Sequence, residues 1–556
     1  MFCLKNNNKN SRYHVALGAA FLSTSMLPTV SHADFNWQVV DGVNVNWSNA
    51  IRYSAAARVS GRDSDLTANP NLDDGNQNFS TGLISNRLEL YSELDVVANN
   101  GFGGRVSALG WYDTVYNRDN DNPGGTVNHN TRDYDEFTKE TRNQHGRDAE
   151  IRDAFLFGSV EVAGMPLGVR LGQHSLVWGE SLFFANNAIA GAQSPFDITR
   201  LLDDPTSEAK EFVLPVPQIS AELQINQDLS IGGYYQFRHR YNRIPAAGSF
   251  FSFSDVVGEG AERLWLVPGQ VAAERDSDMD ARDSGQFGLQ VRWLLGEYDL
   301  GFYALRFHDK DFQQVMRLGQ PFGPFAPPAP TNYYLAYHED TTLYGFSVSR
   351  SFGTVNLAME ASIRKDQSLA STHAADASGL APAGVIPRPD NKDNPAYAVG
   401  DTAHVNVSSI WSMPRTPLWN EANMVTEVAW TRLLKCKQSC DAIDGNVTRD
   451  SWSMRAVFEP TYRQLFAGWD VGIPMGVGFS PNGSRNILGS SAVPAEGGGD
   501  FSIGLSGTYM SEWEFNLAYV NFFGPGGEFL DANNEYSYRQ ARKDRDFVSF
   551  TVRHSF

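Results

Sequence analysis

Residues 172–181, GQHSLVWGES, place a histidine, a glutamate and two serines within ten positions. These are the residue types of a hydrolase site, in which a histidine takes the proton of a serine nucleophile and a carboxylate orients the histidine. On a strand, however, His174 and Ser175 point to opposite faces, and Glu180 and Ser181 lie past the end of the strand. The chain also contains no Gly-x-Ser-x-Gly elbow for a nucleophile. We therefore expect no catalysis here, and a barrel-embedded lipid hydrolase is kept only as an alternative.

A structural interpretation accounts for the same residues. Trp178 packs, Gly179 turns the chain, and Glu180 holds the loop that follows by hydrogen bonds or an ion pair. The candidate partners of the Glu180 carboxylate are Arg170, Arg200 and Lys210. A carboxylate at a constriction also selects solutes by charge, so this structural interpretation already includes a function.

Residues 1–33 have the three parts of a secretory signal peptide. Three basic residues precede an apolar run at 15–27, and residues 31–33 (SHA) form a small-x-small cleavage site. The apolar run is far shorter than the ~20 residues that a spanning helix needs. The mature chain is predicted to begin at Asp34. Cleavage would remove three basic residues and no acidic ones, so the formal charge would change from −19 to −22. Such an acidic chain is not expected to bind nucleic acid.

The mature chain, 34–556, alternates apolar and polar residues along many short segments, which is typical of strands with one dry and one wet face. About eighteen such segments occur, at 43–58, 80–98, 102–116, 149–162, 167–178, 217–226, 229–242, 284–296, 297–309, 341–351, 353–366, 403–413, 420–434, 450–460, 467–480, 499–510, 512–524 and 545–556. A soluble sandwich would not need so many. Short links alternate with long ones rich in Asp, Asn, Gly and Pro, as periplasmic turns and extracellular loops do in bacterial barrels. The last strand ends in Phe556, which resembles the assembly signal of those barrels.

These patterns predict an all-β protein, a transmembrane antiparallel β-barrel of about eighteen strands in the outer membrane of a Gram-negative bacterium. A barrel of this width leaves an aqueous channel unless something fills it. The polar faces of the predicted strands supply the candidate lumen residues, which are Arg87, Glu89, Glu93, Arg170, His174, Arg238, Arg240 and Arg292. They would form a charged ladder for anionic head groups or simply line a wet pore as paired charges.

One long link, at 179–216, is too apolar for a loop in water. We predict that it folds into the barrel as a constriction or plug. The candidate residues of this constriction are Trp178, which precedes the link, and Glu180, Phe183, Phe184, Phe196, Asp197, Lys210 and Glu211 within it.

Four pieces of this region resemble the outer-membrane family catalogued as domain of unknown function 1302. They are the strand and turn at 172–181, Pro-Phe-Asp-Ile at 195–198, Glu-Ala-Lys-Glu at 208–211 and Leu-Pro-Val-Pro at 214–217. The chain departs from the family pattern at His174, at Val177 and at 202–205. The resemblance covers essentially the whole mature chain. It implies the handling of hydrophobic compounds such as alkanes, sterols, fatty acids or other lipids, together with a periplasmic or lipoprotein partner from the family catalogued as domain of unknown function 1329.

Apolar and aromatic residues also occur in the predicted outer loops. The most prominent are Trp265, Phe322, Phe325, Tyr333 and Tyr334. A channel for hydrophilic solutes does not need them, whereas a protein that captures hydrophobic molecules does. Two alternatives remain open, namely that these loops pack on one another as a lid, or that they contact lipid or neighbouring subunits.

Acidic runs and a cysteine pair complete the candidate sites. Residues 276–280 (DSDMD) have the opening spacing of a calcium loop, but Ala281 replaces the glycine and Phe287 the closing glutamate that such a loop requires. An outer loop bridged by Ca²⁺ at this run or at 119–121 is therefore expected sooner than a dedicated cofactor site. Cys436 and Cys440 are predicted to form a disulfide, with a metal pair as the weaker alternative.

The sequence as a whole predicts a channel for hydrophobic or lipid-like molecules that is not an enzyme. A substrate-selective porin for small carboxylates is the first alternative, and a surface adhesin is another. The expected partners are outer-membrane lipid and lipopolysaccharide, the hydrophobic cargo and the periplasmic protein, and a homo-oligomer is left open.

Overall fold

The computed structural model describes residues 35–40, 42–203, 209–323, 326–382, 384–481 and 495–556. The predicted signal peptide at 1–33 lies outside these residues. No helix in the described ranges is long and apolar enough to cross a membrane.

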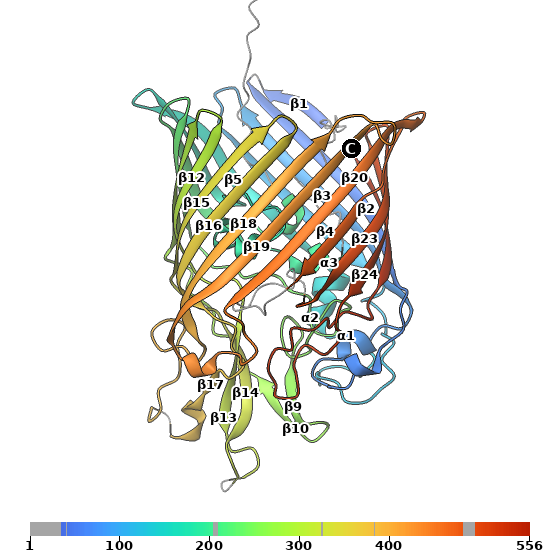
Figure 1. Ribbon diagram of the computed structural model, residues 1–556, viewed down its shortest axis with the longest axis vertical. Helices are drawn as coiled ribbons and strands as arrows, with labels where there is room; N and C mark the ends of the chain where they lie inside the picture. The colour runs from blue at the N-terminus through green and yellow to red at the C-terminus, as the bar shows by residue number, and fades with distance from the viewer. Residues whose placement is uncertain (1–34, 41, 204–208, 324–325, 383, 482–494) are drawn as a thin grey trace, which may run out of the picture.

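Antiparallel strands close into a ring in which each strand pairs with its neighbour in sequence order (Figure 1). In the described chain the ring has eighteen positions, because β21 and β22 together occupy one of them between β20 and β23. The strands are β2 (Val43–Arg58), β3 (Gly82–Ala98), β4 (Gly103–Asp113), β5 (Arg147–Val162), β6 (Met165–His174), β7 (Val216–Gln224), β8 (Leu229–Gln236), β11 (Gln286–Leu295), β12 (Tyr298–Phe307), β15 (Thr341–Phe352), β16 (Val355–Ser368), β18 (Val399–Met413), β19 (Glu421–Gln438), β20 (Asp450–Phe466), β21 (Trp469–Gly472), β22 (Met475–Ser480), β23 (Gly498–Tyr509), β24 (Trp513–Phe523) and β25 (Phe547–Ser555). The pairing of β2 with β25 closes the ring, and the predicted barrel is confirmed.

The outer surface of the ring is apolar and its inner surface is polar, as the period-two pattern predicts. Leu289 on β11 is 59% exposed on the outside, whereas the next residue, Gln290, is 5% exposed and faces inward. On β25, Phe550 is exposed and Arg553 is buried. The exposed apolar side chains are those that a lipid-facing surface requires.

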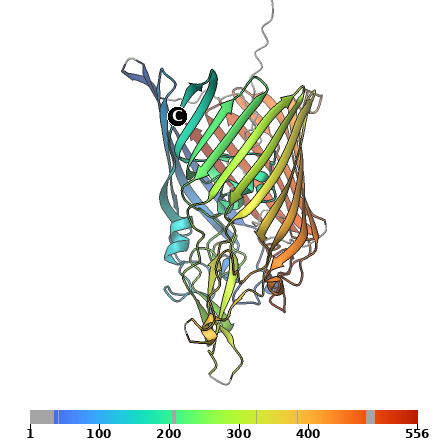
Figure 2. The ribbon, with the colours of Figure 1, turned by 90° about the vertical axis from the view of Figure 1, so that its left-hand side faces the viewer.

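The two ends of the barrel differ. Tight turns and the C-terminus lie at one end, and long loops extend from the other (Figures 1 and 2). Two groups of elements were not predicted from the sequence. β1 (Phe35–Val40) pairs with the start of β2, and a second sheet in the long loops contains β9 (Arg263–Val267), β10 (Val271–Arg275), β13 (Gln313–Gly319), β14 (Ala329–Ala336) and β17 (Ala375–Asp376).

Short helices lie in the loops and inside the ring. The α-helices are α1 (Asp74–Gln77) and α2 (Lys139–Thr141) in the long loops, and α3 (Ile198–Asp203) within the lumen (Figure 1). A fourth, α4 (Ala209–Phe212), contacts α3.

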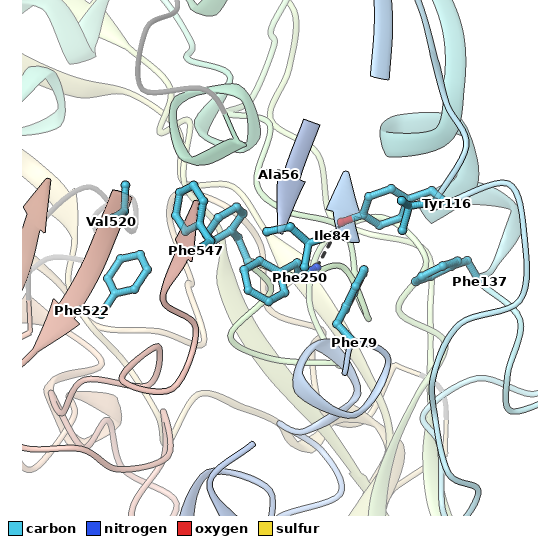
Figure 3. Close-up of a cluster of buried hydrophobic side chains, with 11 residues drawn as sticks. Ala56, Phe79, Ile84, Tyr116, Phe137, Phe250, Val520, Phe522 and Phe547 are labelled. Atoms are coloured by element: carbon cyan, nitrogen blue, oxygen red, sulfur yellow. Dashed lines mark hydrogen bonds between the residues drawn. The ribbon is translucent and has the colours of Figure 1, made fainter. Parts of the chain in front are cut away.

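An aromatic cluster fastens the long loops to one another and to the barrel (Figure 3). The rings of Phe79 and Phe250, from different loops, are 5.5 Å apart, and those of Tyr116 and Phe137 are 5.0 Å apart. The Phe250 N–H donates to the Tyr116 hydroxyl at 3.2 Å. The first pair meets edge to face, a geometry that adds stability beyond the buried area. The loops therefore form a packed cap instead of separate loops in water.

Candidate functional site: a segment across the lumen

The described part of the link between β6 and β7, residues 175–203 and 209–215, folds into the barrel and is called the inward segment below (Figures 1 and 2). Its apolar residues Phe184, Phe196 and Ile198 are buried. The sequence predicted such a segment at 179–216, because that much apolar surface could not remain in water.

Glu427 on β19 holds the first part of the inward segment. Its carboxylate accepts hydrogen bonds from the Ser181 hydroxyl at 2.8 Å and from three consecutive backbone N–H groups, those of residues 182–184. The Asn406 side chain donates to the same carboxylate at 2.7 Å. A carboxylate that accepts several N–H groups is a strong anchor for a backbone that has no strand partner.

A second wall carboxylate, Glu360 on β16, holds the next turn. It accepts from the N–H groups of Glu180 at 2.7 Å and Ile189 at 2.8 Å. Arg364, on the same strand, donates to the carbonyl oxygens of Asn186 and Ala188, both at 2.8 Å. The wall therefore satisfies donors and acceptors of the segment, which buried backbone requires.

The far part of the segment is held by the other side of the ring. Arg200 on α3 pairs with Glu89 on β3 at 2.7 Å, and Arg52 on β2 pairs with Glu211 on α4 at 2.7 Å. β3 and β16 stand nine positions apart in the ring of eighteen, so they lie on opposite walls. The inward segment is therefore bonded to both walls and crosses the lumen.

Apolar packing fixes one flank of the segment. Trp178 and Ile189 are buried against Tyr234, Tyr303 and Leu343, which come from β8, β12 and β15. Gly179 has a φ of +99°, and a side chain there would collide with the Glu360 carboxylate. The predicted roles of Trp178 in packing and of Gly179 in turning the chain are both confirmed.

The other flank borders a cavity of about 1030 Å³. One side of the cavity is apolar and is formed by the inward segment and the outer loops, with Leu182, Phe183, Phe184, Phe196, Ile198, Leu201, Phe212, Phe253, Leu264, Trp265 and Met316. The barrel wall at β20 and β22–β25 supplies most of the charged and hydroxyl groups, Arg455, Glu459, Asp500, Ser502, Ser506, Glu514, Asn516, Thr551 and Arg553, beside apolar residues such as Val457, Val520 and Phe522. The two sides meet where the Arg455 guanidinium lies 5.8 Å from the centre of the Phe183 ring.

The residues that could have formed a hydrolase site do not meet. His174 is 1% exposed; its Nδ1 lies 3.0 Å from the Gly172 carbonyl oxygen and its Nε2 lies 2.8 Å from the Ser220 hydroxyl. The Ser175 hydroxyl donates to the Val213 carbonyl oxygen at 3.4 Å, and Ser181 is bonded to Glu427. Among the described residues, therefore, neither serine of this stretch contacts His174.

The prediction for the Glu180 carboxylate was wrong in part. Arg200 is bonded to Glu89 instead, and Glu180 is held through its backbone N–H. The Lys210 side chain lies outside the described residues. The sequence singled out neither Glu360 nor Glu427, since a lone glutamate on the polar face of a strand looks the same whether it faces water or a buried loop.

The predicted lumen residues fall into two groups. Arg87, Glu89, Glu93 and Arg292 are on strands of the ring, with ion pairs such as Arg87 to Glu89 at 2.8 Å; Arg170 pairs in register with Ser220, the partner of His174. Arg238 and Arg240 were placed on a strand ending at residue 242, but β8 ends at Gln236. The Arg240 side chain donates to the Pro215 carbonyl oxygen, at the end of the inward segment.

The remaining predicted residues lie in the inward segment and the cap. Asp197 pairs with Arg243 at 2.7 Å. Tyr333 and Tyr334 are fully buried within the cap, Trp265 lines the cavity, and Phe322 is half exposed. Phe325 lies outside the described residues.

The cysteine pair and the acidic runs have local partners. Cys436 and Cys440 form a disulfide, as predicted. Within the acidic runs, Asp278 pairs with Arg275 at 2.7 Å and Asp121 accepts from the Ser80 hydroxyl at 2.6 Å.

The fold and its lumen-crossing segment define a transmembrane β-barrel with a divided interior. The chain belongs to the family described as Protein of unknown function (DUF1302), which it matches over residues 14–556. No curated protein matches the chain.

The chain is also similar, at low identity and low TM-score, to several solved structures. Acinetobacter baumannii OccAB2 has a TM-score of 0.43 and 9% identity, with 93% of this chain and 98% of that chain covered. Pseudomonas aeruginosa OpdK with vanillate has a TM-score of 0.41 and 7% identity, with 92% and 98% covered. Salmonella typhi OmpF in complex with daunomycin has a TM-score of 0.38 and 8% identity, with 94% and 100% covered.

Proposed function

We propose that this protein is an outer-membrane channel for hydrophobic or amphipathic molecules, such as alkanes, sterols or fatty acids, in a Gram-negative bacterium. The observation that carries the proposal is the two-sided cavity beside the inward segment. Its apolar side offers Leu182, Phe183 and Leu201 to a hydrocarbon, and its polar side offers hydroxyl, amide and charged groups to a head group. Ligand sites for amphipathic molecules combine these two kinds of surface.

Transport through this channel would be passive. A molecule would enter the cavity from the cap or from the periplasm, and would leave when the inward segment gives way at one of its anchors. A passive pore has no preferred direction, so a periplasmic or lipoprotein partner that removes or delivers the cargo would set it. The family catalogued as domain of unknown function 1329 is our candidate for this partner, on the basis of the family resemblance alone.

Phe183 is the residue on which the proposed cargo class can be tested. Phe183→Asp places a charge on the apolar side of the cavity, and binding of dansyl-undecanoic acid to the purified barrel should weaken at least tenfold, since burying an aromatic ring is worth roughly 1.5–3 kcal/mol. The measurement is a fluorescence titration in detergent. Phe322→Asp, the same change at a half-exposed residue of the cap, is the matched control.

Two results would count against the proposal. Equal binding by the wild type and by Phe183→Asp would exclude the cavity as the binding site. Absence of dansyl-undecanoic acid binding, combined with rapid uptake of a small dicarboxylate into proteoliposomes, would favour a porin for small carboxylates instead.

A further inference from the structure

Three aspartates from two separate loops meet inside the cap. Asp73 and Asp74 lie at the start of α1, in the loop between β2 and β3, and Asp255 lies in the loop between β8 and β9. One carboxylate oxygen of each lies within 4.8 Å of the other two. The three residues are 9%, 4% and 1% exposed, so their charges are screened by very little water.

Within the described residues, no lysine or arginine forms an ion pair with these carboxylates. The two arginines whose charges act on this cluster donate their hydrogen bonds to backbone carbonyl groups. Arg545 donates to the carbonyl oxygens of Phe250 and Ser252, and Arg263 donates to the His129 carbonyl oxygen at 2.7 Å. Buried carboxylates are normally paired or bound to a metal, and neither arginine provides that pairing here.

Oxygen atoms without a hydrogen-bond partner provide a second, independent observation. Asp255 accepts the Asp74 N–H with one oxygen at 3.0 Å, but its other oxygen is buried and has no partner, and the same is true of one oxygen of Asp73. Asn128, which is 2% exposed and whose N–H donates to Asp74 at 3.1 Å, also has an unpartnered side-chain oxygen. Such atoms are rare in folded proteins and call for an ion or a water.

Burial also changes the ionisation of the three carboxyl groups. Burial, followed by the neighbouring Asp255 carboxylate, raises the pKa of Asp73 to about 8. Burial also raises the pKa of Asp74 well above its usual value and that of Asp255 to about 6. A bound cation would remove this penalty.

We infer that Asp73, Asp74 and Asp255 bind a divalent cation of the calcium type. The ligands are all hard oxygens, with no histidine or cysteine among them, which favours Ca²⁺ or Mg²⁺ over zinc or copper. Asn128 stands beside the trio and can add an amide oxygen. The site differs from the two acidic runs that the sequence suggested, because the aspartates come from loops about 180 residues apart.

The position of the site gives the cation a role in the channel. It joins the loop at 59–81 to the loop at 237–262. Asn71 and Leu72 of the first loop, and Phe253 and Val256 of the second, line the cavity. The cation therefore holds the outer wall of the cavity together, beside the contact between Phe79 and Phe250 (Figure 3).

Terbium luminescence on the purified full-length barrel tests this inference directly. Tb³⁺ should bind with a saturable signal that Ca²⁺ displaces, and the Asp255→Asn variant should weaken this binding at least tenfold. The control is Asp133→Asn, which removes an exposed carboxylate of another outer loop, outside both acidic runs. Ca²⁺ should also raise the Tm of the wild type and of Asp133→Asn, and EDTA should reverse the rise.

Asp73→Asn is a second variant, used if Asp255→Asn fails to assemble. A wild-type protein that shows no saturable Tb³⁺ signal and no Ca²⁺-dependent Tm would overturn the inference. Binding that survives both Asp255→Asn and Asp73→Asn, each assembled as a heat-modifiable barrel, would overturn it as well. Neither result would affect the proposed cargo, which is read from dansyl-undecanoic acid binding.

Discussion

The Glu427 carboxylate bonds to backbone N–H groups and a hydroxyl of the inward segment instead of to a cation. A strand residue can accept the hydrogen bonds of a loop in this way because its side chain points into the lumen while its own backbone stays paired in the sheet. The anchor depends on one side chain, and its removal leaves three backbone N–H groups without their acceptor. The segment is therefore held firmly, yet by contacts that a single substitution can weaken.

Glu427→Gln should loosen the inward segment without disturbing the barrel. The amide keeps the shape but loses the charge and one acceptor, which costs on the order of 2 kcal/mol, or about thirtyfold in the population of the released segment. Hydrogen exchange at the amides of residues 182–184 should accelerate accordingly. Glu93→Gln is the matched control, because Glu93 bonds to Tyr91 and Arg105 and not to the segment. Unchanged exchange in Glu427→Gln would show that the anchor lies elsewhere.

The geometry of His174 predicts the absence of ester hydrolysis by the stretch at 172–181. The purified wild type, Ser175→Ala and Ser181→Ala should release p-nitrophenol from a long-chain p-nitrophenyl ester at the same rate as buffer with detergent. The two serines are bonded to Val213 and to Glu427, and neither bonds to an imidazole. Activity in the wild type that either substitution abolishes would restore the hydrolase alternative.

Along each strand of the barrel, lipid-facing apolar residues alternate with lumen-facing polar residues, and this alternation can be tested at one position. Leu289→Arg puts a charge on the lipid face near the middle of β11 and should destabilise the assembled barrel by about 2–4 kcal/mol. Ser502→Arg, on a strand that borders the water-accessible cavity, should have a much smaller effect. Unfolding in lipid vesicles, followed by heat-modifiable mobility, measures both. Equal loss in the two variants would contradict the assignment of the faces.

The elements of the barrel wall could be predicted from the sequence because period-two alternation is local and repeats around the ring. β2 was predicted at 43–58 and is found there. β8 was predicted to extend to residue 242 but ends at Gln236. The prediction was too long because the alternating pattern continues through Phe237 and Tyr241, beyond the last hydrogen bond of the strand pair. The five-stranded sheet of the cap was missed, since its strands pair across loops and carry no alternating face.

The candidate site was only half visible in the sequence. The inward segment could be predicted from its apolar residues, which had to be buried. Its anchors could not, because Glu360 and Glu427 lie about 180 and 240 residues further along the chain and only the closure of the ring brings them to the segment. The aspartate trio was invisible for the same reason, as Asp73 and Asp255 meet only through the packing of the cap.

The whole molecule is a wide barrel whose interior is divided. On one flank of the inward segment, Trp178 and Ile189 pack against the wall; on the other flank a cavity remains, apolar on one side and polar on the other. Opposite walls hold the segment, so its release at either wall would change the width of the passage. Under the proposed function, we expect such a channel to conduct ions poorly while admitting a molecule that can bind to the apolar side.

Single-channel conductance in a planar bilayer tests this account most directly. The wild type is compared with a variant in which residues 182–202 are replaced by a glycine-serine linker of equal length. The linker keeps the chain between β6 and β7 continuous but lacks the side chains that are bonded to the barrel wall. We predict low conductance for the wild type and a large, stable pore for the variant. A wide-open wild type whose conductance does not change with the replacement would contradict the claim that the inward segment divides the lumen.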